Sequence, residues 1–120
     1  MKAYVAAPFY RKDEVRQVIK DLACLGVEST ARWVDSHNSD YDAKPEVLKT
    51  EAAEDLYDIE RADTFILLAH WPKEGSGGKD VEFGYALGRG KKMVVVGEPY
   101  NLFHQRSEVA VVSKVEDIRW

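Results

Sequence analysis

Short apolar runs alternate along this chain with segments in which apolar residues recur at helical spacing. Five runs have the length and the β-favouring composition of buried strands, and the second of them is the weakest. "TFILLAH" and "KMVVVGE" are apolar almost throughout, as expected for central parallel strands that are covered on both faces. The first run ends at Pro8 and continues into a loop. The predicted strands lie within 2–10, 27–34, 64–70, 92–98 and 109–112.

The helical segments lie between these runs, and glycine or proline marks their ends. Gly26 follows the first segment and suits a helix C-terminus. Pro45 suits the first turn of the second helix, and Gly90 ends the third. The predicted helices are 11–25, 45–62 and 80–89, and "VEDIRW" predicts a final helical turn. The apolar faces of the first two consist of Val15, Val18, Ile19, Leu22 and Leu25, and of Val47, Leu48, Ala52, Leu56 and Ile59.

Strand and helix alternate throughout, and this pattern predicts one doubly wound α/β domain over residues 1–120. Its sheet, Rossmann-like or flavodoxin-like, should contain about five parallel strands flanked by helices. In such sheets ligands bind outside the carboxyl ends of the strands. The loops after Ala7, Ala69 and Gly97 are therefore the candidates for a site.

Composition and charge limit the classes of partner and the cellular location that we expect for this protein. The chain has 120 residues, of which 45% are hydrophobic and 32% are charged, and its net charge is −4. Scattered Lys and Arg residues argue against nucleic acid polymers and anionic membrane surfaces as partners. A strand-like start, the lack of a long apolar run and a single cysteine, Cys24, favour the cytoplasm. Cys24 falls in an apolar stretch and is predicted to be a small core residue.

The segment "GSGGKDVEFGYALGRGKK" combines a glycine loop with a helix start. It matches neither the dinucleotide fingerprint nor the P-loop, so it is a weak nucleotide motif taken alone. Glu82 is predicted in the first turn, where the helix dipole favours an ionised carboxylate. Its apolar neighbours predict a mostly buried helix. Glu82 is then either a helix-dipole partner or a functional carboxylate, and the spacing leaves both open.

A second carboxylate, Asp55, adjoins the apolar stripe of the second predicted helix. Two carboxylates brought together at strand ends suit glycosidic chemistry, one as nucleophile and the other in proton transfer or orientation. The sequence lacks the motifs of two competing chemistries. The histidines do not have the spacing of a zinc site, and the G-x-S-x-G elbow of serine hydrolases is absent. No metal and no cofactor are expected.

Four segments together resemble the nucleoside 2-deoxyribosyltransferase family and its relatives that hydrolyse nucleotide N-glycosidic bonds. They are "AYVAAPFY", "EDLYDIERADTFILL", "GGKDVEFGYALGRGKKMVVVG" and "YNLFH". The resemblance implies that Glu82 is the nucleophile at C1′ of the sugar and that Tyr4 orients it. Asp55 would lie at the sugar hydroxyls, near the nucleophile. Asn101 would reach the 5′ end of the sugar in a neighbouring subunit, which implies a homodimer or larger homo-oligomer with shared active sites.

The resemblance also implies a small-molecule nucleoside or nucleotide substrate and a place in nucleotide salvage or clean-up. Deoxyribosyl transfer, hydrolysis, cleavage of a 5′-monophosphate and a sensing module without turnover all stay open. Asp80 is the acid nearest to the nucleophile on its upstream side and is the candidate general acid. The expected substrate-binding residues are Ala7, Pro8, Phe9, Gly77, Gly78, Asp80, Asn101 and Phe103, with Arg11 and Ser76 for a phosphate and Phe9, Tyr10 and Trp71 as a wall for the base.

Overall fold

The computed structural model describes residues 1–36, 43–70 and 77–120. Five strands form one sheet in the order β2-β1-β3-β4-β5, and every neighbouring pair is parallel. The predicted doubly wound α/β fold is confirmed. The strands are β1 (Lys2–Ala6), β2 (Glu28–Ser29), β3 (Thr64–Leu68), β4 (Lys92–Val96) and β5 (Val109–Val112).

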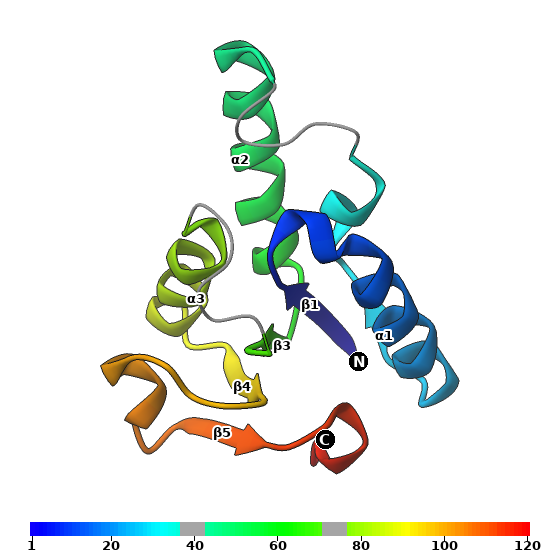
Figure 1. The fold of residues 1–120 in the computed structure, drawn as a ribbon, viewed down its shortest axis with the longest axis vertical. Helices are drawn as coiled ribbons and strands as arrows, with labels where there is room; N and C mark the ends of the chain where they lie inside the picture. Colours follow the sequence, from blue (N-terminus) through cyan, green and yellow to red (C-terminus); the bar gives the residue numbers. More distant parts are fainter. Residues whose placement is uncertain (37–42, 71–76) are drawn as a thin grey trace.

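Helices cover both faces of the sheet (Figure 1). α1 (Lys12–Cys24) packs on one face, together with the short C-terminal 3₁₀ helix η4 (Val115–Asp117). α2 (Pro45–Glu60) and α3 (Gly78–Gly88) pack on the other face. Alternate residues of β1, β3 and β4 enter the two core clusters, so Tyr4 faces α2 and α3 whereas Val5 faces α1. Three further 3₁₀ helices are η1 (Phe9–Arg11), η2 (Arg32–Asp35) and η3 (Leu102–Gln105).

The predicted helix ends are close to the observed ones. Gly26 and Gly90 follow α1 and α3 with φ angles of 79° and 72°, the left-handed backbone that glycine adopts readily at a helix end. The predicted final helical turn is η4. In the part of the chain that the structure describes, no helix is both long and apolar enough to span a bilayer.

The second strand is much shorter than predicted. Only Glu28 and Ser29 pair with β1, and the chain then leaves the sheet and forms η2. The indole N–H of Trp33 donates to the carbonyl of Val5 at 2.8 Å. Because the amides of Glu28 and Thr30 bond the carbonyls of residues 1 and 3, Trp33 supplies the next donor on the same edge of β1. The side chain thus satisfies a strand carbonyl that a longer β2 would have bonded.

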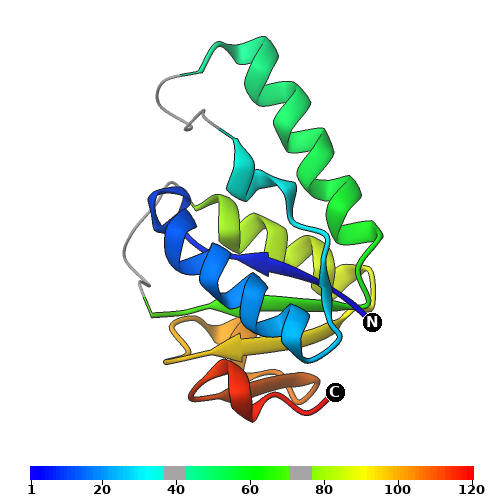
Figure 2. The same ribbon diagram turned by 90° about the vertical axis from the view of Figure 1, so that its right-hand side faces the viewer.

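Several predicted core positions are exposed. Cys24 lies on the surface, because it follows the buried Leu22 by two residues, about 200° around the helix. Val47 is exposed because the N-terminal half of α2 extends past the sheet (Figure 2). Val81 is 71% exposed, so α3 is buried along one side only, through Lys79, Phe83 and Ala86.

Candidate active site

The hydroxyl of Tyr4 donates a hydrogen bond to Oε2 of Glu82 at 2.6 Å. Tyr4 is fully buried in the middle of β1, and its ring stacks on Phe65 with the centroids 5.7 Å apart. Glu82 is the fifth residue of α3, so it lies in the second turn rather than the predicted first. The helix dipole therefore acts on Asp80, which lies in the first turn, rather than on Glu82. Glu82 is oriented instead by a buried phenol from the central sheet.

Asp55 completes a pair of carboxyl groups. It lies on α2, and a hydrogen bond joins its side chain to Glu82. Two carboxyl groups can share such a bond only when one of them carries a proton. Burial raises the pKa of Asp55 to about 7, with the charges of Asp58 and Glu51 acting in the same direction and the bond to Glu82 opposing them. Near neutral pH, Asp55 thus exists in both the protonated and the ionised form.

The pKa of Tyr4 is raised well above its ordinary value, first by burial and then by the negative charges of Glu82 and Asp55. The phenol therefore stays neutral and remains a hydrogen-bond donor. Its donated bond stabilises the ionised form of the carboxylate that accepts it. The structure brings together Tyr4, Asp55 and Glu82, three predicted site residues that are separated by 51 and 27 positions in the sequence.

Asp80 faces the other side of α3. It lies two residues before Glu82, about 200° around the helix. Its carboxylate accepts a bond from the Tyr100 hydroxyl and forms an ion pair with Lys79 at 3.5 Å. Burial and the bond to Asp80 raise the pKa of Tyr100. The structure does not bring Asp80 together with the two carboxyl groups of the candidate site.

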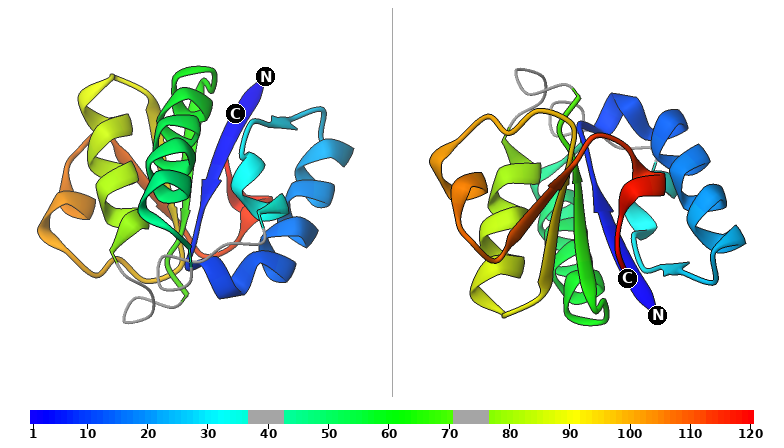
Figure 3. Two further views of the ribbon diagram at one scale, coloured as in Figure 1. Left: turned by 90° about the horizontal axis from the view of Figure 1, so that it is seen from above. Right: turned by 90° about the horizontal axis from the view of Figure 1, so that it is seen from below.

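Asn101 caps the N-terminus of η3, which lies on the flank of α3 that faces away from α2 (Figure 3). Its Oδ1 accepts bonds from the backbone N–H groups of Phe103 and His104, at 2.9 and 3.2 Å. Since Oδ1 is occupied in this way, the side-chain NH₂ group is left to donate to a ligand. Phe103 is 53% exposed beside it. Because α3 separates Asn101 from Asp55, the two do not line one site within a single chain.

The remaining predicted contacts follow β1 or precede α3. Pro8 is buried, whereas Ala7 and Phe9 are partly buried at the carboxyl end of β1. Arg11 forms an ion pair with Glu14 at 3.6 Å, and Tyr10 is 58% exposed. Gly77 and Gly78 form the start of α3, and an added Cβ would meet open space at both. Ser76 and Trp71 lie outside the described residues.

Two residues near the site were not predicted from the sequence. The ring of Trp33 lies 6.4 Å from that of Phe9, so Trp33 is an aromatic neighbour at the carboxyl end of β1. Asp58 is a fully buried carboxylate one turn after Asp55. The sequence offered one signal for Asp58: it is an acidic residue next to Ile59, which belongs to the predicted apolar face of this helix. Trp33 had no signal apart from its residue type.

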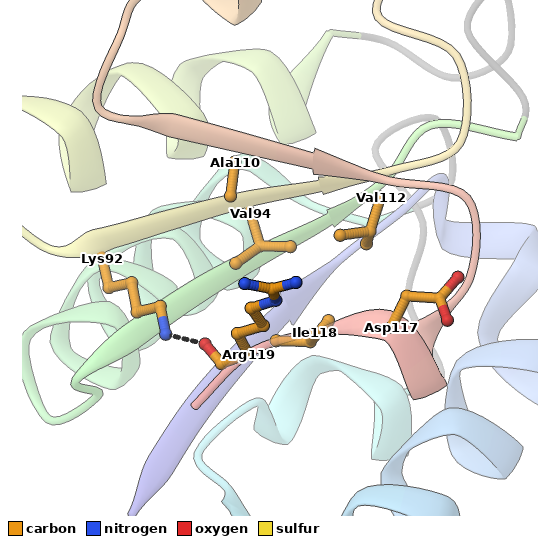
Figure 4. A pocket seen from close by; sticks show the side chains of 7 residues that line it. All are labelled: Lys92, Val94, Ala110, Val112, Asp117, Ile118 and Arg119. Carbon is orange, nitrogen blue, oxygen red and sulfur yellow. Dashed lines mark hydrogen bonds between the residues drawn. The ribbon is translucent and has the colours of Figure 1, made fainter.

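No metal centre accompanies the carboxyl pair in the part of the chain that the structure describes, and a mainly apolar cavity lies away from it. Among residues 1–36, 43–70 and 77–120, no group of three or more His, Cys, Asp or Glu side chains could hold a metal ion. A cavity of about 120 Å³ lies on the face of the sheet opposite to Glu82, beneath the C-terminal segment (Figure 4). It is lined mainly by apolar side chains, and Lys92 closes one end by bonding the carbonyl of Arg119. Its lining residues are Lys92, Val94, Ala110, Val112, Asp117, Ile118 and Arg119.

No protein-family model matches this chain, and no curated protein matches it. The structure is similar to that of a CMP N-glycosidase from Clostridium botulinum, BcmB, with a TM-score of 0.64. The likeness covers 93% of this chain and 88% of BcmB, and 22% of the aligned residues are identical. The two proteins share a fold. The shared fold agrees with the predicted one and extends over nearly the whole of both chains.

Proposed function

We propose that this protein cleaves the N-glycosidic bond of nucleosides or nucleotides through a covalent glycosyl intermediate on Glu82. The observation that carries the proposal is the pair of hydrogen-bonded carboxyl groups, Asp55 and Glu82, oriented by a buried Tyr4. One carboxyl group must be ionised to attack a sugar carbon, and the other must carry a proton for the departing base. A pKa of about 7 lets Asp55 carry a proton at neutral pH, and the proposal requires the proton that the pair shares to lie on Asp55 rather than on Glu82 when the base departs.

In the first step a carboxylate oxygen of Glu82 forms a bond to C1′ while the bond from C1′ to the base nitrogen breaks. The electron pair of that bond goes to the base, and Asp55 gives the base its proton. Positive charge develops on the sugar in the transition state, and the ionised Glu82 stabilises it. In the second step Asp55 accepts a proton from water, whose oxygen attacks C1′ and releases Glu82. If a second base attacks instead of water, the same intermediate supports deoxyribosyl transfer.

A nucleoside 5′-monophosphate is the second candidate substrate. BcmB is described as a CMP N-glycosidase, and this chain has nearly the same extent. Arg11, Ser76 and the start of α3 are the groups proposed to accept a phosphate. A free 5′-hydroxyl and a 5′-phosphate both accept hydrogen bonds, so the NH₂ group of a neighbouring subunit's Asn101 suits either.

The decisive experiment incubates the purified protein with 2′-deoxynucleosides, ribonucleosides and their monophosphates, with and without free adenine. Release of base without adenine identifies a hydrolase, and exchange only in its presence identifies a transferase. Saturable binding without any product would overturn the proposal in favour of a sensing module.

Glu82→Gln should lower turnover at least 10³-fold, because the amide cannot form the glycosyl ester. Intact-protein mass spectrometry of the wild type with a slow 2′-fluoro substrate should detect the covalent adduct, and Glu82→Gln should not form it. Undiminished base release by this variant would contradict the mechanism.

A further inference from the structure

Asp58 is a charged side chain that the proposed mechanism does not use. It is fully buried, and it lies one turn beyond Asp55 on the same side of α2. The backbone N–H of Arg32 donates to its carboxylate at 3.2 Å, and the Arg32 guanidinium approaches to 2.9 Å. The guanidinium of Arg61 lies 3.0 Å from the same carboxylate.

These contacts join η2 to α2. The hydroxyl of Thr30 donates to the backbone carbonyl of Asp58 at 2.7 Å, and Arg61 also reaches the carbonyl of Thr30 at 3.4 Å. A buried carboxylate is costly unless charged donors surround it, and here donors from two elements do so. The carboxylate of Asp58 is therefore held in one position by donors from two elements.

The titratable groups near Asp55 come from three elements. Glu51, Glu54 and Asp58 lie on its own helix, Glu82 on α3 and Tyr4 on β1. Arg32 and Arg61 bond Asp58, so they offset its charge. Among the acids on α2, Asp58 has the largest influence on Asp55.

We propose that Asp58 is a positioning residue: held by Arg32 and Arg61, it places a negative charge beside Asp55 and so determines whether Asp55 enters the reaction with a proton. The catalytic part of this inference rests on the proposed function. The proposed role predicts two opposite shifts in the charge of Asp55. Removing the charge of Asp58 favours the ionised form of Asp55, whereas removing a guanidinium that offsets this charge favours the protonated form.

The experiment compares Asp58→Asn and Arg32→Gln. The first variant keeps the shape of the side chain, and the second keeps the backbone bond from residue 32 to Asp58. The guanidinium of Arg32 lies at the surface, with 52% of its side chain exposed, so its loss should leave the fold intact. In profiles of kcat/KM against pH, the basic limb should move down by about one pH unit in Asp58→Asn and up in Arg32→Gln.

Glu60→Gln is the matched control, since Glu60 is another carboxylate of α2 with ion-pair partners, Arg89 among them, and it is not among the groups with the largest influence on Asp55. The basic limb of the kcat/KM profile of Glu60→Gln should stay at the wild-type pH. A purely structural role for Asp58 would lower activity in both variants without moving the limbs in opposite directions, and that result would overturn the inference.

A second readout does not need turnover. Carbon-13 NMR of selectively labelled aspartate follows the carboxyl group of Asp55 directly, and its midpoint should shift in the same two directions. Shifted midpoints in a protein that releases no base would refute the proposed function and support the control of Asp55 by Asp58. Equal midpoints in the wild type and Arg32→Gln would refute that control even in an active enzyme. If Asp58→Asn does not fold, the midpoint of Asp55 in Arg32→Gln, compared with that in the wild type, still tests the inference.

Discussion

At the scale of single residues, the proposed chemistry depends on one proton. Asp55 is an ordinary aspartate in the sequence, and burial together with neighbouring charges raises its pKa to about 7. The Tyr4 hydroxyl cannot replace Asp55 as the group that gains and loses a proton near neutral pH, because burial and nearby negative charge raise the pKa of Tyr4 further above neutrality. Asp55 is therefore a group of the candidate site that changes charge near neutral pH, and Tyr4 is a fixed donor beside it.

The raised pKa of Asp55 makes the folded state less stable when the group is ionised. The folded chain holds this proton to a higher pH than the unfolded chain does, so stability should fall as the pH rises from about 4 to above 7. Asp55→Asn should remove this loss and stabilise the protein at pH 8 by about 1–2 kcal/mol, because solvent still screens a partly buried group. Urea unfolding at pH 4.5 and pH 8 checks the expectation. Equal gains at both values would contradict it.

Tyr4→Phe should lower kcat/KM by about 10–100-fold, because a hydrogen bond to a charged group contributes about 1.5–3 kcal/mol. Tyr85→Phe is the control, since its hydroxyl also bonds a glutamate at 2.6 Å, but this glutamate is Glu60 at the end of α2, away from the site. Similar stability losses but unequal losses of kcat/KM are expected. If the two variants lose kcat/KM equally, Tyr4 has no special role.

At the scale of elements, η2 replaces most of a strand. The chain leaves β1 after Ser29, yet Trp33 returns an N–H group to the edge of β1 at Val5. On its other side, Arg32 bonds the buried Asp58 of α2. The element is thus tied to the sheet and to the helix that carries Asp55.

Trp33→Phe keeps an aromatic ring but removes the indole donor. It leaves the Val5 carbonyl without its partner in a largely buried position, which should cost about 1–3 kcal/mol of stability. Trp120→Phe is the control, because Trp120 is 37% exposed at the end of the chain. Denaturant unfolding followed by circular dichroism measures both. A loss below 0.5 kcal/mol for Trp33→Phe would show that water satisfies the carbonyl.

At the scale of the whole molecule, α3 divides two groups of polar residues. Asp55, Glu82 and Tyr4 lie on one flank, whereas Asp80, Tyr100 and Asn101 lie on the other. Figure 3 shows α3 between α2 and η3. An Asn101 that serves the sugar must therefore serve it in another copy of the chain, which agrees with the proposed shared site.

Complementation tests this arrangement. Asn101→Ala and Glu82→Gln should each be poorly active alone, whereas co-expression should restore about a quarter of wild-type activity in a dimer. The reason is that half of the randomly assorted dimers contain one intact site. Co-expression with no gain, or a strictly monomeric wild type in light scattering, would remove Asn101 from the site.

The sequence by itself determined the elements and the architecture. Apolar runs and helical stripes are local patterns, and Gly26 and Gly90 ended helices where their residue type predicts. The resemblance in sequence also nominated Tyr4, Asp55 and Glu82 before any contact among them was known. The strand predicted over 27–34 was wrong beyond Ser29, because the competing bond from Trp33 is a tertiary contact.

Only the tertiary structure decided which carboxylates meet and what charge they carry. Asp80 and Glu82 are two residues apart in one helix, yet one bonds Tyr100 and the other Tyr4. The core placement expected for Cys24 was wrong for a related reason, since helix phase relative to the sheet sets exposure. A pKa depends on burial and on charges from distant segments, and no local pattern of residues contains either quantity.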